Sequence, residues 1–77
     1  MSRIENFEKA EMQRMQLHDV VDAKYYVHEC DGRNLLQIST FGRPTRDIRG
    51  KLSQTIQLDS DAARQLFDIL RENFGFR

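Results

Sequence analysis

The residues best suited to contact a ligand form a basic stretch between positions 43 and 54. Arg43, Arg46, Arg49 and Lys51 stand there against one acidic residue, Asp47, in a chain whose net charge is zero. Their steps of three, three and two residues follow neither a strand nor a helix, so we expect a loop with cations at its rim. Such cations can displace counterions from a phosphate backbone, which predicts weak, salt-sensitive binding to a nucleic acid. A solvated basic hairpin that binds nothing is the alternative.

Catalytic chemistry finds little support in the sequence. His18 and His28 could act as general bases, but neither has a partner at a recognisable spacing. Cys30 comes at the end of an expected strand, just before a turn, where an inert thiol is the simpler interpretation. Neither a phosphate-cradling glycine loop nor the paired short spacings of a structural zinc site are present. We therefore expect no enzyme activity, no cofactor and no metal site.

Length and cysteine content limit how the chain can be stabilised. A chain of 77 residues buries only about 60% of its unfolded surface, which leaves a marginal core. Cys30 is the only cysteine, so no internal disulfide can form. Oligomerisation is the remaining option, and we expect a homodimer. The sequence shows no apolar run typical of a membrane span or a signal peptide, so we expect a cytoplasmic protein without a membrane partner.

The elements that must position these residues form an α+β pattern. β-Branched and aromatic residues favour a strand over 23–30, and Asp31-Gly32 is a strong hairpin signal before a return strand over 34–41. Residues 51–58 alternate as the clearest strand, whereas 45–50 form either a loop or a short edge strand. We predict one domain over residues 23–77, built on a three- to four-stranded antiparallel β-meander in which every connection is short.

An amphipathic helix over about 59–73 is expected to close this domain. Asp59 or Ser60 can cap its first turn, and Gly75 stands where a C-cap glycine belongs. Apolar residues recur at spacings of three and four, and neighbours widen the stripe beyond what one small sheet needs. We therefore expect part of the helix to meet a second copy of the chain. The residues that we assign to this dimer interface are Ala62, Leu66, Ile69 and Phe74.

The N-terminal segment, residues 1–22, is acidic and rich in helix formers, and it has no glycine or proline. Its apolar residues make only a ragged stripe. The sequence therefore leaves two interpretations open, a short helix and a partly disordered arm. An arm that becomes ordered against a second subunit would agree with both observations.

The sheet face that points away from the helix is a second candidate binding surface. If Leu36 and Ile38 point towards the helix, the residues that alternate with them point away. Those residues are mostly amides and hydroxyls, together with Phe41 and either Tyr25 or Tyr26, a composition suited to single-stranded nucleic acid. Ordinary exposed strands are the alternative interpretation. The contacts predicted on this face are Tyr26, Gln37, Phe41, Ser53, Thr55 and Gln57.

A group of local motifs runs through residues 23–74. They are Asp31-Gly32-Arg33 with Leu36-Gln37-Ile38, then Gly42-Arg43-Pro44, Gly50-Lys51-Leu52-Ser53, and Ile56-Gln57-Leu58 leading into the helix at Ser60. Together with the plan of sheet and C-terminal helix, this pattern resembles the single-stranded-DNA-binding transcriptional regulator fold. That group includes the positive-cofactor-four coactivators, the plant Whirly proteins and the Pur repeats.

The resemblance implies a function and a set of roles. It implies that the helices form a dimer interface, that Arg43, Arg46, Arg49 and Lys51 contact phosphate, and that Tyr26 and Phe41 stack on bases. We therefore expect a small homodimeric protein that binds single-stranded DNA or RNA and acts as a regulatory or accessory factor. The alternative is a protein-interaction module that binds no nucleic acid and assembles with a larger protein through its helix face and N-terminal arm.

Overall fold

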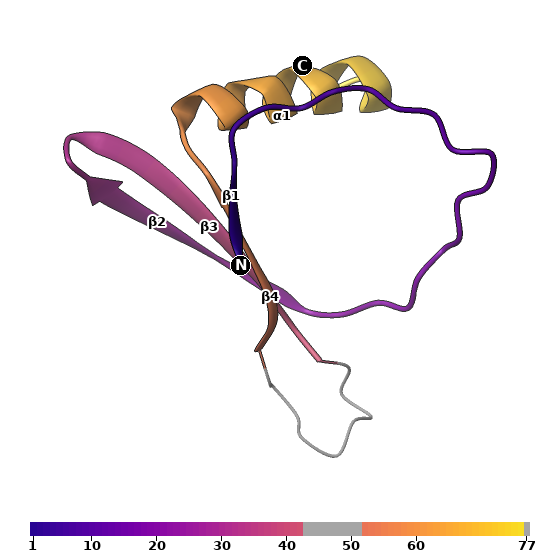
Figure 1. The fold of residues 1–77 in the computed structure, drawn as a ribbon, viewed down its shortest axis with the longest axis horizontal. Coiled ribbons are helices and arrows are strands. Elements are labelled where there is room, and N and C mark those ends of the chain that lie inside the picture. Colours follow the sequence, from indigo (N-terminus) through magenta and orange to yellow (C-terminus); the bar gives the residue numbers. More distant parts are fainter. Residues whose placement is uncertain (43–51, 77) are drawn as a thin grey trace.

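A computed structural model describes residues 1–42 and 52–76 of the chain, and at positions 52 and 53 it describes the backbone alone. Four strands precede one helix, as Figure 1 shows: β1 (Ser2–Ile4), β2 (Ala23–Cys30), β3 (Arg33–Phe41), β4 (Leu52–Leu58) and α1 (Ser60–Phe74). The α+β class and the C-terminal helix are therefore as predicted. The possible edge strand over 45–50 lies outside the described residues.

The four strands form one mixed sheet in the order β1-β4-β3-β2. β2 pairs antiparallel with β3, and β3 pairs antiparallel with β4, so this part of the predicted meander is confirmed. The fourth strand is different, because β1 comes from the N-terminus and pairs with β4 in parallel. The prediction of a purely antiparallel sheet was wrong, since three residues are too few to show the alternation that marks a strand.

Residues 5–22 form a long irregular connection rather than the helix that the sequence left open. They run from β1 at one edge of the sheet to β2 at the opposite edge, and they arc away from the sheet on the side of α1 (Figure 1). Strands that point the same way need such a crossover, so β1 adds a long connection outside the predicted meander. Two contacts hold its start to α1. The Phe7 N–H donates to Gln65 Oε1 at 2.9 Å, and Gln65 Nε2 donates to the Glu5 carbonyl at 3.5 Å.

The turn between β2 and β3 sets the register of the sheet. Asp31 and Gly32 have φ angles of 53° and 74°, and both therefore occupy the left-handed region that a type I′ hairpin turn needs. Cys30 pairs with Arg33 directly across the turn, and every pair that follows along the hairpin has a fixed partner. The predicted hairpin is confirmed. Its register decides which side chains share each face of the sheet.

Both ends of α1 are capped as the sequence predicts. Asp59 is the N-cap, and its Oδ1 accepts a hydrogen bond from the Ala62 N–H at 3.0 Å. Gly75 ends the helix with a φ of 72°, and its N–H donates to the Arg71 carbonyl at 3.1 Å. Asp61 in the first turn and Arg71 in the last turn also match the helix dipole. These local signals fix the length of the helix independently of its packing.

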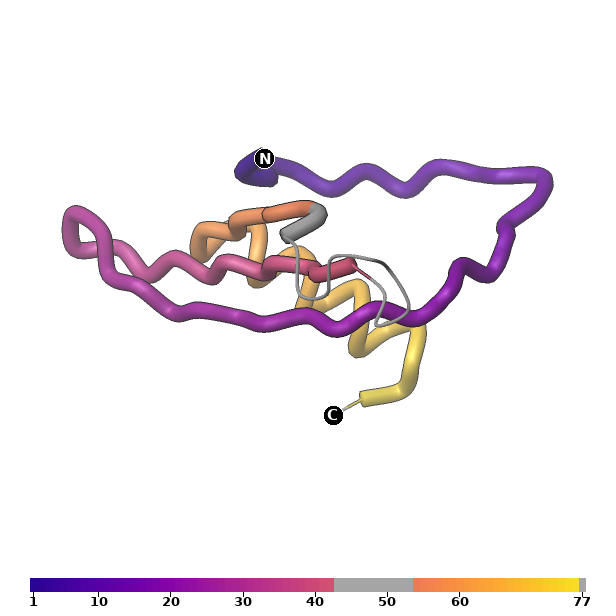
Figure 2. Tube along the Cα trace, turned by 90° about the horizontal axis from the view of Figure 1, so that it is seen from below, coloured from indigo at the N-terminus to yellow at the C-terminus, as the bar shows by residue number. Residues whose placement is uncertain are grey.

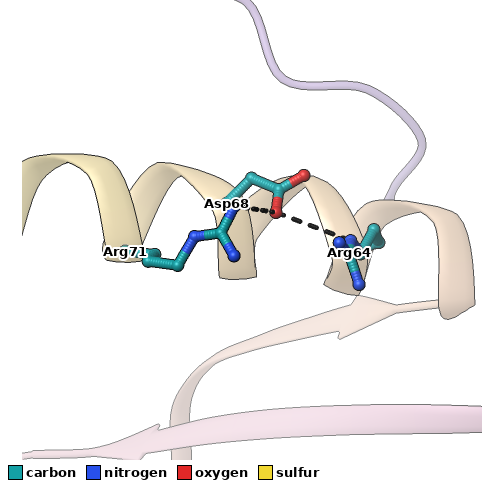
Figure 3. A network of polar contacts seen from close by, with 3 residues as sticks. All are labelled: Arg64, Asp68 and Arg71. Carbon is teal, nitrogen blue, oxygen red and sulfur yellow. Dashed lines mark ion pairs between the residues drawn. The ribbon is translucent and has the colours of Figure 1, made fainter. Parts of the chain in front are cut away.

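A small ion-pair network lies on the outer surface of α1 (Figure 3). Asp68 Oδ1 lies 3.5 Å from Arg64 Nε and 3.8 Å from Arg71 Nη2. Both guanidinium groups also lie over the Phe67 ring, at 5.4 Å and 5.6 Å from its centroid. Exposed pairs at these spacings stabilise a helix by only about 0.3–0.5 kcal/mol each. The network therefore supports the helix without replacing a core.

We expect Asp59→Ala to lower the free energy of unfolding by about 1 kcal/mol, because the first turn of α1 loses the acceptor for the Ala62 N–H. Urea denaturation followed by circular dichroism measures this change. Asp59→Asn is the matched control, because its side-chain oxygen can still accept the bond. Equal losses in the two variants would contradict the assigned capping role.

The single chain is open and has a thin core. α1 packs on β3 and β4, and within the described residues Leu58 and Ala62 are the buried hydrophobic side chains. No large side chain in that part of the chain is fully buried. The radius of gyration is 14.8 Å, compared with about 11–12 Å for a compact domain of this length. Of the residues predicted to meet a second copy, Ala62 is buried within the single chain, whereas Leu66, Ile69 and Phe74 keep exposed surface.

Candidate nucleic-acid interface

The register of the sheet separates its two faces. Residues directly opposite each other on neighbouring strands share a face, so Val27, Leu36 and Leu58 lie together. These three residues line a small pocket with Ala63 of α1, which identifies their side of the sheet as the helix side. Leu36 therefore faces the helix and Gln37 faces away, which is the condition on which the candidate binding face depends. We call the opposite side the helix-free face.

Four residues form a straight row across the helix-free face. Tyr26 of β2 lies opposite Gln37 of β3, Gln37 lies opposite Gln57 of β4, and Gln57 lies beside Arg3 of β1. At the usual strand spacing, the row is about 14 Å long. Tyr26 is 47% exposed, and the two glutamines are half-buried. The row therefore places an accessible aromatic ring, two amides and a guanidinium group in one line.

A hydrogen-bond ladder holds the centre of this face. Gln57 Nε2 donates to Gln37 Oε1 at 3.0 Å, and Gln37 Nε2 donates to Ser39 Oγ at 3.3 Å. Ser39 Oγ and Thr55 Oγ1 share a further bond of 3.4 Å, and both residues are buried. Thr55 was predicted to contact a ligand, but it has little exposed surface and its hydroxyl binds Ser39. Thr55 therefore holds Ser39 in place at the end of the ladder. The second amide N–H of each glutamine is a further hydrogen-bond donor that a ligand could use.

Every charged side chain that the described strands place on the helix-free face is basic. Lys24, Arg33 and Arg3 share this face, whereas Glu29 lies on the helix side opposite Asn34. The Lys24 ammonium group lies 5.2 Å from the centroid of the Phe41 ring. Phe41 is thus half-buried beneath a cation, and Tyr26 is the more accessible aromatic residue. The strands therefore contribute only cations to this face, while Asp31 of the turn and Asp59 of the helix cap line a pocket with Arg3 and Arg33.

These cations were not found from the sequence. Lys24 is two residues from Tyr26, and Arg33 is four residues from Gln37. Residues at these spacings in a strand share a face, so strand periodicity applied to charged residues would have placed both cations on this face. Arg3 gave no such signal, because it belongs to a three-residue strand within a segment that favoured a helix or an arm.

No family model, curated protein or solved structure matches this chain. The resemblance of plan to single-stranded-DNA-binding regulators therefore remains a hypothesis, and the case for the site depends on its own geometry. No helix in residues 1–42 and 52–76 is both long and apolar enough to cross a membrane. The same residues hold no group of three or more histidine, cysteine, aspartate or glutamate side chains placed to bind a metal ion.

The predicted contact residues fall into two sets. Tyr26, Gln37 and Gln57 are brought together on the helix-free face, with Thr55 beneath them. Phe41 follows a register shift in β3, and its ring lies against Lys24 of this face. The second set lies outside the described residues, and it consists of Arg43, Arg46, Arg49, Lys51 and the side chain of Ser53. In the sequence, Gly42 separates Phe41 from Arg43, the first cation of that stretch.

Proposed function

We propose that this protein is a small homodimeric protein that binds single-stranded DNA or RNA on its helix-free face, as a regulatory or accessory factor. The observation that carries the proposal is the row of Tyr26, Gln37, Gln57 and Arg3 across four strands, flanked by further cations and free of acidic strand residues. An accessible aromatic ring, oriented amides and several cations are the groups that bind bases, sugars and phosphates.

Each group has a distinct role in this proposal. Tyr26 stacks on an unpaired base, and the amides of Gln37 and Gln57 donate to base edges or sugar hydroxyls. Arg3, Lys24 and Arg33 neutralise phosphates, as do the cations of the basic stretch. Single strands are favoured over a duplex because paired bases are already stacked, so a tyrosine ring on a sheet face cannot reach their faces. The ladder of hydrogen bonds keeps the amides in place before the ligand arrives.

Salt dependence tests the electrostatic part of the proposal. We expect a fluorescently labelled single strand to bind in an anisotropy titration at about 50 mM salt and to bind more weakly at about 200 mM. The combined change Arg3→Gln, Lys24→Gln and Arg33→Gln should weaken binding. It should also reduce the slope of log K against log salt by about 2, since each lost phosphate contact removes about 0.7 on a single strand.

The matched control removes the same charge elsewhere. Lys9, Arg14 and Arg64 are exposed and lie off the sheet, so their combined change to glutamine should leave the slope nearly unchanged. Equal slopes in the two triple variants would assign the binding to net charge rather than to the helix-free face. An absence of binding at the lower salt concentration would end the proposal.

The alternative function is a protein-interaction module that binds no nucleic acid. Its support is the exposed apolar surface of α1, which includes Phe67, Ile69 and Phe74. A pull-down of a different protein that resists nuclease and is lost on Leu66 or Ile69 substitution would favour this alternative. The nucleic-acid proposal predicts instead that nuclease releases what is captured.

A further inference from the structure

β2 is a long strand with a free edge. It is the last strand in the order β1-β4-β3-β2, and all eight of its residues are exposed. The opposite edge of the sheet is formed by β1, which has only three residues. A long exposed edge with apolar side chains is a template for pairing with another strand. Natural proteins usually protect such an edge, and in this protomer the described residues leave it uncovered.

The turn geometry shows which backbone groups point outward from this edge. In a type I′ turn the Cys30 carbonyl accepts from the Arg33 N–H, so Cys30 and Arg33 form a hydrogen-bonded pair. Such pairs alternate along an antiparallel hairpin. The N–H and C=O groups of Tyr25, Val27 and Glu29 therefore point away from β3. They form a regular row of unpaired donors and acceptors.

The C-terminal half of α1 leaves the sheet. α1 starts at the end of β4 and packs on β3 and β4. Its C-terminal end projects past β2 in the view of Figure 2, whereas Figure 1 shows that this end stands off from the sheet on the helix side. The apolar residues of this half remain exposed, among them Phe67, Ile69, Leu70 and Phe74. On the helix side of β2, Tyr25 is 75% exposed and Val27 is 70% exposed. The apolar residues of this half of α1 and the apolar side chains of β2 are therefore both uncovered, on the same side of the sheet.

The uncovered area is large enough for a stable dimer. The chain exposes 7509 Å², whereas a compact protein of this mass exposes about 4900 Å². The excess of about 2600 Å² is spread over the whole chain, including the exposed connection over residues 5–22. It exceeds the roughly 800 Å² per partner that a standard interface buries, so a dimer has surface to cover. The thin core gives the same indication, because a chain this small that lacks an internal disulfide commonly gains stability from a partner.

We infer that a second copy of this chain pairs with β2, antiparallel and about a two-fold axis normal to the sheet, to form one continuous eight-stranded sheet. A second copy suits this edge because an antiparallel strand of the same sequence always matches it in length, and the contact closes on itself. The C-terminal half of each α1 then lies on the same side of the continuous sheet as its counterpart, because the axis is normal to the sheet. The main contact is thus the β2 edge, with the helices added to it.

The charges of β2 are compatible with self-pairing. When Val27 lies on the two-fold axis, Tyr25 faces Glu29 of the partner subunit and Tyr26 faces His28 of the partner subunit, so no like charges are opposed. Registers centred on Tyr25 or Tyr26 also keep five or more residues paired. A centre at Lys24 would set two ammonium groups against each other, which is destabilising. The two-fold axis is therefore expected to pass through one of positions 25, 26 and 27.

The inference that β2 pairs with a second copy does not depend on nucleic-acid binding, although such a dimer is compatible with the proposed binding face. An axis normal to the sheet turns both helix-free faces to the same side, so the two rows of Tyr26, Gln37, Gln57 and Arg3 form one longer surface. A dimer that binds no oligonucleotide would leave this inference intact. A monomer that binds one would leave only the nucleic-acid part of the proposed function intact.

Sedimentation equilibrium and a cysteine scan test the inference. We expect the unsubstituted chain to sediment at twice its mass of 9.1 kDa. The scan uses Cys30→Ser as background and adds Tyr25→Cys, Tyr26→Cys or Val27→Cys. Residues on the axis have Cα atoms about 4.5–5.5 Å apart, which is within disulfide range. One of the three variants should therefore oxidise to a covalent dimer much more completely than the other two.

The control is Met15→Cys in the same background, because Met15 is exposed and lies in the connection between β1 and β2. The fraction of Met15→Cys that oxidises to a covalent dimer gives the level of disulfide formation from random collisions between chains. A single position among 25–27 that exceeds this control supports edge pairing. A monomer in sedimentation, a dimer in which none of the three exceeds the control, or heteromeric assembly in place of self-association would each overturn the inference.

Discussion

Leu58→Ala is expected to lower the free energy of unfolding by about 2–5 kcal/mol, which is a large share of the total stability of a domain this small. Leu58 is 2% exposed, it pairs with Leu36 and Ile4 on neighbouring strands, and it ends β4 just before the N-cap of α1. Truncation leaves a cavity where the sheet meets the helix. Urea denaturation followed by circular dichroism measures the loss.

Leu17→Ala is the matched control, because it removes the same atoms from a side chain that is 97% exposed. Its effect should stay within about 0.5 kcal/mol, as for ordinary surface substitutions. If stability depends on dimerisation, the unfolding midpoint of both proteins also rises with protein concentration. Equal losses in the two variants would show that Leu58 is not part of the core.

The sequence was sufficient for the part of the fold that local signals determine. The Asp31-Gly32 turn fixed the β2–β3 hairpin, because both residues take positive φ angles that glycine and aspartate tolerate better than most residues. Alternation in β4 marked the strand and its two faces. Asp59 and Gly75 marked the ends of α1 through hydrogen bonds within one turn of each end. Each of these features depends on residues close together in the chain.

The N-terminal part of the fold depended on distant contacts, and its structure was not predictable in the same way. β1 pairs with β4 more than fifty positions away, as in the pair Ser2 and Ile56, and three residues carry no measurable period. Helix propensity in residues 5–22 was overridden, because this segment must span the sheet from one edge to the other. Propensity is a weak prior when topology sets the path of the chain.

The candidate site shows the same division. Tyr26, Gln37 and Gln57 were predicted from alternation, and they do lie in one row. Lys24 and Arg33 were not predicted, because they are far apart in the sequence and belong to no basic stretch. They share a face only through the pairing of β2 with β3. Arg3 joins the row only through the parallel pairing of β1. Cations that are scattered along the chain can therefore be brought to one face of a sheet.

Tyr26→Ala is expected to weaken binding of a labelled single strand by about 5–150-fold, since a base stacked on an aromatic residue contributes about 1–3 kcal/mol. Tyr26 is the accessible aromatic ring of the row, whereas Phe41 is half-buried beneath Lys24. Fluorescence anisotropy at fixed low salt measures the change. The salt slope should stay the same, because stacking releases no counterion.

Tyr26→Phe is the control that separates stacking from other roles of this residue. It keeps the ring and removes only the hydroxyl, so binding should fall far less than in Tyr26→Ala. Sedimentation of both variants is needed as well, because Tyr26 belongs to the strand whose backbone we expect to pair with a second copy. If Tyr26→Ala remains a dimer and still binds as tightly as the unsubstituted protein, the row is not a stacking platform. Binding would then be carried by the cations alone.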